Sequence, residues 1–394
     1  RLACSSILTP RIQISPEELA AGENFLEYNK SLKDALLERD FLIETLSLAL
    51  LAREHVVVVG PAGVAKSAAA VQALTNITEL DGKPSFWKRQ FSPETTLSDL
   101  NGHVSFKALT EEDKQRRNVN DALVKHRFGF GDEFMDASPR VLRYLLEALN
   151  ERTVSDGEVV HNGALHTFVG ATNKYIAEVF DAFDRQGYPE GPRAVMDRIF
   201  FKVFVPADFM EASSDLKLLG GWIDSPIQKQ SYVDLETVRT LVKRVDFPLS
   251  SQILFSILSR LYDLEGKKLE FESTGIYMEA KKAGGRPELP YRQTTTFTKR
   301  TLVKTQQILK AIVVLDYLRH KGQRPLAVTF QDIHAFGKFV GMIGPGRSDT
   351  LAHLLDQSIN PYERNQLSIV VQERDRYETI FAHLVKTQNE ALIQ

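Results

Sequence analysis

A valine-rich segment followed by a glycine-containing loop constrains the fold more than any other feature of this sequence. His55–Val59 includes four consecutive valines, which is typical of a short buried strand. Gly60-Pro61 then begins a turn, and the run KSAAAVQALTNI, which starts at Lys66, favours a helix. A strand, a loop and a helix in this order begin a parallel α/β unit. The sequence therefore predicts an α/β fold with a parallel sheet.

The loop has the composition of a phosphate-binding loop. It reads GPAGVAKS, which follows the pattern G-x-x-x-x-[G/A]-K-S. In such a loop the backbone amides point at the β-phosphate of ATP, Lys66 reaches the β- and γ-phosphate oxygens, and Ser67 ligates Mg²⁺. Ala65 replaces the usual last glycine, and we expect a negative φ at this residue, because a Cβ then does no harm. The predicted nucleotide-binding residues of the loop are Gly60, Pro61, Ala62, Gly63, Val64, Ala65, Lys66 and Ser67.

Polar residues at the ends of two further strands complete the predicted site. The segment FGFGDE places Asp132 and Glu133 directly after an apolar strand. We expect Asp132 to hold Mg²⁺ and Glu133 to orient and deprotonate the attacking water. Asn173 ends the strand TFVGAT and is expected to lie beside the γ-phosphate and help to place the water. The alternatives are an ordinary Gly/Pro turn, a surface acidic turn and a turn-initiating Asn, and the combination of the three segments favours a nucleotide site.

The spacing of the predicted elements indicates several units along the 394 residues. Strands alternate with helices as far as residue 206, which predicts a three-layer α/β domain with a five-stranded parallel sheet over residues 31–206. An irregular arm is expected at residues 1–30, an all-α lid domain at 207–345, and a helical extension at 346–394. The expected strands besides His55–Val59 are Trp87–Phe91, Arg127–Phe130, His166–Ala171 and Ile199–Val205, and the expected helices include Ser31–Ala52, Pro139–Glu151, Leu235–Val245, Ser250–Leu264, Arg300–His320 and Phe330–Phe339.

Composition narrows the possible partners and the compartment. The formal net charge of −2 provides no general attraction to nucleic acid or to an anionic membrane. No run of 18 apolar residues is present, so no membrane span is expected. A single cysteine, Cys4, excludes an internal disulfide framework and fits a reducing compartment. These features predict a cytoplasmic location.

The motifs together resemble those of the MoxR family of AAA+ ATPases, and most closely its RavA branch. The resemblance covers about residues 30–345 and is strongest up to residue 206. The motifs that carry it are LLERD at 36–40, GPAGVAKS at 60–67, FSPE at 91–94, GDEF at 131–134, LLEALNER at 145–152, GATN at 170–173 and MDR at 196–198.

The resemblance implies further roles for particular residues. Arg198 matches the family's arginine finger, with Arg193 as a nearby competitor for that role. Arg300 matches the sensor II arginine, which touches the nucleotide from the second domain. Ser92–Ser105 corresponds to the insert within helix 2, and Arg152–Leu165 to the hairpin before sensor I, where Asp156-Gly157 also favours a hairpin turn.

The resemblance also implies an assembly and a class of activity. Members of the family act as chaperone-like remodelling ATPases, as rings that are usually hexameric, and commonly with a partner that carries a von Willebrand factor A domain. The D-x-S-x-S motif of that domain is absent from this sequence, so such a partner would be a separate chain.

A nucleic-acid motor or a magnesium-chelatase-like motor subunit is the alternative. Seven Lys or Arg residues stand against one acid in residues 281–304, a pattern that can bind nucleic acid. However, the two inserts are not basic: Arg152–Leu165 has one Arg against two acids, and Ser92–Ser105 has no basic Lys or Arg against two acids. Phosphate binding through these inserts would be weak, so the remodelling ATPase is favoured. A scaffold without hydrolysis is disfavoured because Lys66, Ser67, Asp132 and Glu133 are all present.

Overall fold

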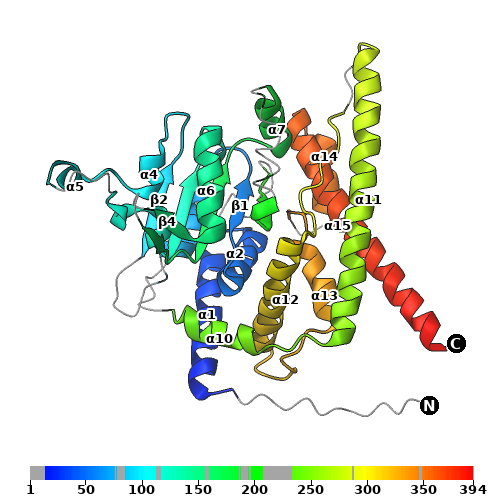
Figure 1. The fold of residues 1–394 in the computed structure, drawn as a ribbon. Coiled ribbons are helices and arrows are strands. Elements are labelled where there is room, and N and C mark those ends of the chain that lie inside the picture. Colours follow the sequence, from blue (N-terminus) through cyan, green and yellow to red (C-terminus); the bar gives the residue numbers. More distant parts are fainter. Residues whose placement is uncertain are drawn as a thin grey trace, which may run out of the picture.

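The centre of the molecule is a parallel sheet of six strands in the order β2-β3-β6-β1-β7-β8 (Figure 1). The computed structural model describes residues 14–75, 77, 85–111, 117–155, 159–185, 187, 194, 197–206, 233–285, 288–345 and 348–393. β1 lies between β6 and β7, and every neighbouring pair in this sheet is parallel. The strands are β1 (Val56–Val59), β2 (Phe86–Gln90), β3 (Phe128–Asp132), β6 (Thr167–Thr172), β7 (Phe201–Phe204) and β8 (Met342–Ile343).

The expectation of five strands was wrong, because a sixth strand comes from a distant part of the chain. β8 pairs with β7 through Lys202↔Met342 and Val203↔Ile343. The sequence around it reads GMIGPG, in which two apolar residues between glycines are too short to indicate a strand. The main-chain N–H of Met342 donates to a carboxylate oxygen of Glu373, 2.6 Å away, and Glu373 is fully buried. The pairing with β7 and this contact with a residue 31 positions later both lie outside the local sequence.

Each face of the sheet has its own hydrophobic core. Along β1 the side chains alternate between the two faces, as they must in a strand. Val56 and Val58 contribute to the core shared with the N-terminal helices and with helices between residues 235 and 336. Val57 and Val59 contribute to the core on the other face, which contains residues of the helices at 139–151, 176–185, 348–357 and 361–393. The helices that follow the first strands are α3 (Lys66–Thr75), α4 (Leu97–Asn101), α5 (Phe106–Glu111), α6 (Pro139–Glu151) and α7 (Ile176–Arg185), with short 3-10 turns at Val119–Asp121, Leu123–Lys125 and Phe134–Asp136.

The N-terminal part is more regular than expected. α1 (Pro16–Ala35) begins with a capping box between Ser15 and Glu18 and buries Phe25 and Tyr28, so an irregular arm was wrong for residues 16–30. The single helix expected over Ser31–Ala52 is also divided. α1 ends at Ala35, Glu38 has a positive φ of 55°, and α2 (Asp40–Ala52) starts two residues later. Residues 1–13 lie outside the described part of the chain.

The expected hairpin in Arg152–Leu165 is confirmed. β4 (Thr153–Ser155) pairs antiparallel with β5 (Val160–Asn162), through the pairs Thr153↔Asn162, Val154↔His161 and Ser155↔Val160. Asp156-Gly157, predicted as its turn, lies outside the described residues.

In the described residues from 233 onwards the named elements are helices apart from β8, as expected, but one helix is much longer than its predicted range. α11 (Leu249–Lys282) contains 34 residues and extends 18 residues beyond the predicted end at Leu264. The other helices are α10 (Leu235–Arg244), α12 (Lys299–Arg319), α13 (Phe330–Phe336) followed by a 3-10 turn at Gly337–Phe339, α14 (Ser348–Gln357) and α15 (Pro361–Ile393). None of the helices in the described residues is long and apolar enough to cross a membrane.

Candidate nucleotide-binding site

The loop Gly60–Ser67 leaves the carboxyl end of β1 and leads directly into α3. Gly60 lies so close to β7 that a Cβ at this residue would be 2.1 Å from the main-chain oxygen of Val205, which no side chain could tolerate. Its N–H donates to the main-chain oxygen of Thr172 over 3.2 Å. By contrast, a Cβ built at Gly63 meets nothing within 4 Å, so the middle of the loop borders open space. The loop is therefore anchored at its start and open where a phosphate would approach.

Ala65 does not have the negative φ that we expected from the sequence. Its φ is +60°, in the left-handed region, and this expectation was therefore wrong. For a non-glycine residue this conformation costs about 1 kcal/mol or more of free energy. The side chain of Arg39, only 4 % exposed, donates from Nε to the neighbouring main-chain oxygen of Val64 over 3.2 Å. We infer that this contact helps to hold the loop in its strained shape, a role that sequence patterns did not reveal for Arg39.

Lys66 is buried in the loop with its ammonium group fully engaged. Nζ donates to the main-chain oxygens of Gly60 and Pro61, at 2.7 and 2.6 Å, and to Oδ1 of Asn173 at 2.7 Å. Burial lowers the pKa of Lys66 to about 8, although the negative charges of Glu133 and Asp132 act in the opposite direction. Anionic phosphate oxygens would suit this ammonium group better than neutral carbonyls, because they would compensate its lost hydration with a full negative charge.

The two acids and Asn173 meet this lysine at one edge of the sheet. Ser67 Oγ donates to the carboxylate of Asp132 over 3.1 Å. Glu133 accepts hydrogen bonds from the main-chain N–H of Asn173, at 3.0 Å, and from its side-chain amide. β3, β6 and β1 are adjacent and parallel, so their carboxyl ends bring these residues together, as the sequence predicted.

Glu133 has the environment of a proton acceptor. Burial raises its pKa above the usual range, the main-chain N–H of Asn173 opposes that shift, and the nearby charges of Asp136 and Asp132 add to it. The residue also has a positive φ of 50°. A carboxylate with a raised pKa is a better base towards water than an exposed one.

The donor set fits Mg²⁺ together with a nucleotide. The hydroxyl of Ser67 and the carboxylate of Asp132 are oxygen ligands that already lie within hydrogen-bonding distance of each other. Mg²⁺ is commonly held by one or two such protein oxygens plus phosphates and water. Among the described residues no group of three or more His, Cys, Asp or Glu could hold a metal ion without such a ligand. The hydroxyl of Ser67 and the carboxylate of Asp132 therefore fit a Mg²⁺ ion that is bound together with ATP.

The depressed pKa of Lys66 predicts a pH dependence of ATP binding. Phosphate favours the charged ammonium, so binding should raise the pKa of Lys66 from its value of about 8 and take up a proton. Affinity for Mg-ATP should then be full below pH 8 and fall by up to about tenfold per pH unit above it. Fluorescence titration with a labelled ATP analogue between pH 7 and 9.5 measures this. Calorimetry in two buffers of different ionisation enthalpy should show proton uptake near pH 8.5, and an affinity that is constant across this range would contradict the prediction.

Arg198 lies at the opposite end of the sheet from the loop. It stands three residues before β7, which runs parallel to β1 with Val56↔Phe201 and Val59↔Phe204 in register. Arg198 therefore lies at the amino end of these strands and the loop at their carboxyl end, about 10 Å or more away. Lys304, on α12, holds this segment: its Nζ donates to the main-chain oxygen of Arg198 at 2.6 Å and to Glu54 at 2.9 Å. Arg193 lies outside the described residues.

Arg300 is placed beside this segment and not beside the loop of its own chain. Its Nη1 lies 3.8 Å from the carboxylate of Asp197, the residue before Arg198. The side chain is 43 % exposed. The structure thus brings Arg300 to Asp197, next to Arg198 in the sequence, whereas the resemblance alone had suggested a contact with the nucleotide from the second domain.

The basic stretch 281–304 is partly engaged within the chain. Arg292 pairs with Glu270 at 3.4 Å and lies over the ring of Phe180, in addition to the contacts of Arg300 and Lys304. These contacts indicate a structural role for three of its seven basic residues, which reduces the charge that the stretch could offer to nucleic acid.

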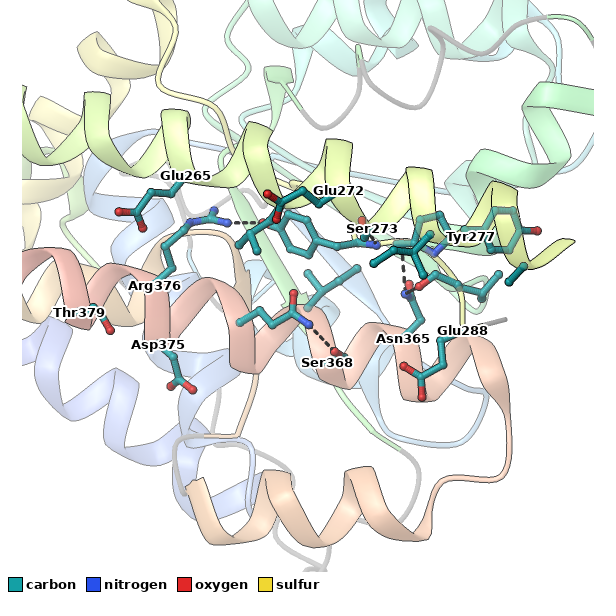
Figure 2. A pocket seen from close by; sticks show the side chains of 18 residues that line it. Glu265, Glu272, Ser273, Tyr277, Glu288, Asn365, Ser368, Asp375, Arg376 and Thr379 are labelled. Atoms are coloured by element: carbon teal, nitrogen blue, oxygen red, sulfur yellow. Dashed lines mark hydrogen bonds between the residues drawn. The ribbon is translucent and has the colours of Figure 1, made fainter. Parts of the chain in front are cut away.

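A separate cavity of about 890 Å³ lies between α11 and α15 (Figure 2). Two of its lining residues, Tyr291 and Arg376, belong to a buried polar network. The guanidinium of Arg376 lies 3.9 Å from the ring centroid of Tyr262 and donates to Tyr291, and Glu373 accepts hydrogen bonds from Thr294 and Met342. None of the residues that line it belongs to the loop at 60–67. We therefore assign this network to the docking of α15, which the sequence had not indicated.

Comparison with known proteins decides the family. Residues 23–243, more than half of the chain, match the model of the MoxR domain in the MoxR-vWA-beta-propeller ternary systems. The chain belongs to the MoxR family. The matched range includes the loop at 60–67, the acids at 132–133, Asn173 and Arg198.

Individual relatives of this MoxR protein are distant. Chaperone MoxR1 of Mycobacterium tuberculosis is 28 % identical over 190 residues, 48 % of this chain and 46 % of that protein. An uncharacterised protein of Methanocaldococcus jannaschii is 29 % identical over 145 residues, 37 % of each chain. The chain thus matches less than half the length of these curated relatives. A crystal structure from Cytophaga hutchinsonii, of a protein assigned as an ATPase, has a TM-score of 0.53 with 16 % identity over 91 % of this chain and 96 % of that one, which shows a shared fold.

Proposed function

We propose that this MoxR protein hydrolyses ATP and uses the energy to remodel protein complexes as a chaperone-like AAA+ motor. The observation that carries the proposal is the convergence of Lys66, Ser67, Asp132, Glu133 and Asn173 at one edge of the sheet. These residues provide a cation for the phosphates, two oxygen ligands for Mg²⁺ and a base for water. The name of the relative chaperone MoxR1 supports the chaperone class.

The hydrolytic step would follow from the contacts of these side chains. The γ-phosphate of ATP would replace neutral oxygens as the hydrogen-bond acceptor of Lys66. Ser67 and Asp132 would hold Mg²⁺, which neutralises charge on the phosphates. Glu133 would accept a proton from the attacking water. Asn173 contacts both Lys66 and Glu133, so it would keep the base aligned with the phosphate-binding cation.

The separation of Arg198 from the loop of its own chain supports a ring, with a hexamer as the expected form. In a ring, Arg198 of one subunit could face the nucleotide of the next. The exposed guanidinium of Arg300, which lies near Asp197, could then face the same nucleotide. Our proposal therefore includes Arg198 as the arginine finger and Arg300 as a second arginine that acts across the seam.

Other parts of the proposal rest on the sequence and on the family. A separate partner with a von Willebrand factor A domain is supported by the description of the matched family model. The RavA branch rests on the sequence motifs, and a cytoplasmic location rests on the composition. The division into units at 31–206, 207–345 and 346–394 is also part of the proposal. Met342 and Ile343, near the end of the second unit, pair with the sheet of the first.

The test of the proposal is ATP turnover combined with assembly. Purified protein should release phosphate from ATP, and chelation of Mg²⁺ with EDTA should reduce the rate to background, because the phosphate charge is then uncompensated. Multi-angle light scattering should show a mass increase with Mg-ATP. A monomeric mass at saturating Mg-ATP would contradict the ring, and strong stimulation of turnover by single-stranded DNA would favour the nucleic-acid motor instead.

A further inference from the structure

The long helix α11 exposes a regular apolar row on the side away from the core. Its inner side chains, among them Leu254, Leu258 and Tyr262, are buried. On the opposite side the row consists of Ile257, Leu264, Phe271 and Met278, which are 44, 67, 82 and 52 % exposed. α11 runs along one side of the molecule, and one of its ends rises above the neighbouring helices (Figure 1). The exposures show that no element in the described part of the chain covers this row.

The spacing of the row is that of a coiled-coil seam. Its members are seven residues apart, so on an α-helix they drift by only about 20° per heptad and form a nearly straight line. A second row with the same spacing, offset by three or four residues, completes the two seam positions of a heptad. It consists of Ile253, Arg260, Lys267 and Thr274. Arg260 and Lys267 are exposed, and neither forms an ion pair among the described residues.

We propose that this side of α11 docks an amphipathic helix of a partner protein. The contact surface consists of Ile257, Leu264, Phe271 and Met278, with Arg260 and Lys267 between them. The partner helix has an apolar seam that carries acids opposite the two cations. Apolar side chains at one seam position provide the contact area, and charged residues at the other select the partner. Acidic residues are the complement because docking removes water from the two cations. The carboxylate of Asp263, which lies within range of the charge of Lys267, already accepts hydrogen bonds from Gln293 and from the main-chain N–H of Phe297. This inference goes beyond the ATPase function and does not depend on it.

Charge and shape favour this occupant over a second copy of the chain or a membrane. Two parallel copies of α11 would place Arg260 against Arg260, and two antiparallel copies would place Arg260 and Lys267 against apolar residues of the first row. A helix that lies in a membrane surface needs a broad apolar face, whereas a seam with two cations in its second row is narrow. A partner helix satisfies both features.

The test uses two designed helical peptides, each about four heptads long, and the full chain. One peptide has Leu at one seam position and Glu at the other, and its twin has Lys in place of Glu. Fluorescence anisotropy should show that the acidic peptide binds at least about tenfold more tightly than the basic one. Phe271→Ser should weaken acidic-peptide binding by about tenfold or more, whereas Ile359→Ser, at an apolar residue that is 97 % exposed outside α11, should leave it unchanged.

A charge reversal makes the test specific for the second row. The double variant Arg260→Glu with Lys267→Glu should prefer the basic peptide, and its circular dichroism spectrum and ATP turnover should match those of the wild type. Equal affinity for both peptides, or no binding of either, would overturn the proposal. Two other results would also overturn the proposal, if Phe271→Ser abolished them. One is binding of the protein to vesicles of phosphatidylcholine and phosphatidylserine, and the other is a concentration-dependent dimer in light scattering.

Discussion

Arg198→Ala should bind Mg-ATP with normal affinity but hydrolyse it on the order of 10³-fold more slowly. An arginine that faces the γ-phosphate neutralises charge that develops on the transferred phosphoryl group, and such a residue contributes about 10³-fold or more in P-loop enzymes. Arg198 lies at the amino end of β7, and the loop lies at the carboxyl end of β1. The ATP on which Arg198 acts should therefore be bound by the neighbouring subunit. Binding is measured with a fluorescent nucleotide, and turnover by phosphate release.

Mixing of subunits separates action in trans from a general loss of structure. Arg198→Ala and Lys66→Ala subunits should each be inactive alone. Mixed rings should recover part of the activity, because some seams then combine an intact loop with an intact arginine. Arg143→Ala, at an exposed arginine on α6, is the matched control and should keep near-normal turnover. Failure to recover activity despite demonstrated co-assembly would contradict trans action, and loss of activity in Arg193→Ala but not in Arg198→Ala would transfer the role to Arg193.

Glu133→Gln should keep ATP binding and lower turnover by on the order of 10²-fold or more. The amide has the shape of the carboxylate and can still contact Asn173, but it cannot accept a proton from water. Lys66→Ala should instead abolish tight binding, because it removes the buried ammonium that phosphate would engage. The two variants therefore separate binding from chemistry.

Single-turnover kinetics with radiolabelled ATP measures the effect of Glu133→Gln on the chemical step, and equilibrium binding measures that of Lys66→Ala. Glu147→Gln, at an exposed carboxylate on α6, is the matched control and should behave as the wild type. Normal turnover by Glu133→Gln would show that another group is the base. The turnover of Asp132→Asn should then be compared with that of Glu133→Gln. Asp132 accepts a hydrogen bond from Ser67 and would hold Mg²⁺ with it, so the turnover of Asp132→Asn should depend differently on Mg²⁺ concentration.

The main elements of the site could be predicted from the sequence because each depends on a local pattern. Val56–Val59 is buried on both faces of the sheet, so it appears in the sequence as an uninterrupted apolar run. In parallel strands polar residues at the carboxyl ends converge on one edge, so Asp132, Glu133 and Asn173 could be assigned to the same site as Lys66 before any coordinates. Both steps need only the strand order of a parallel sheet and the position of each residue within its strand.

The tertiary structure decided the features that depend on contacts distant in sequence. The φ of Ala65 is positive although its residue type disfavours this, in a loop that makes a close contact at Gly60 with Val205 and accepts a hydrogen bond from the buried side chain of Arg39. β8 pairs with β7, and its main chain also donates to Glu373. α12 brings Arg300 and Lys304 to the segment before β7, 100 residues earlier in the chain. Residue type and periodicity describe a chain locally, whereas strained backbone, very short strands and the partners of charged side chains are set by whichever distant segment packs against them.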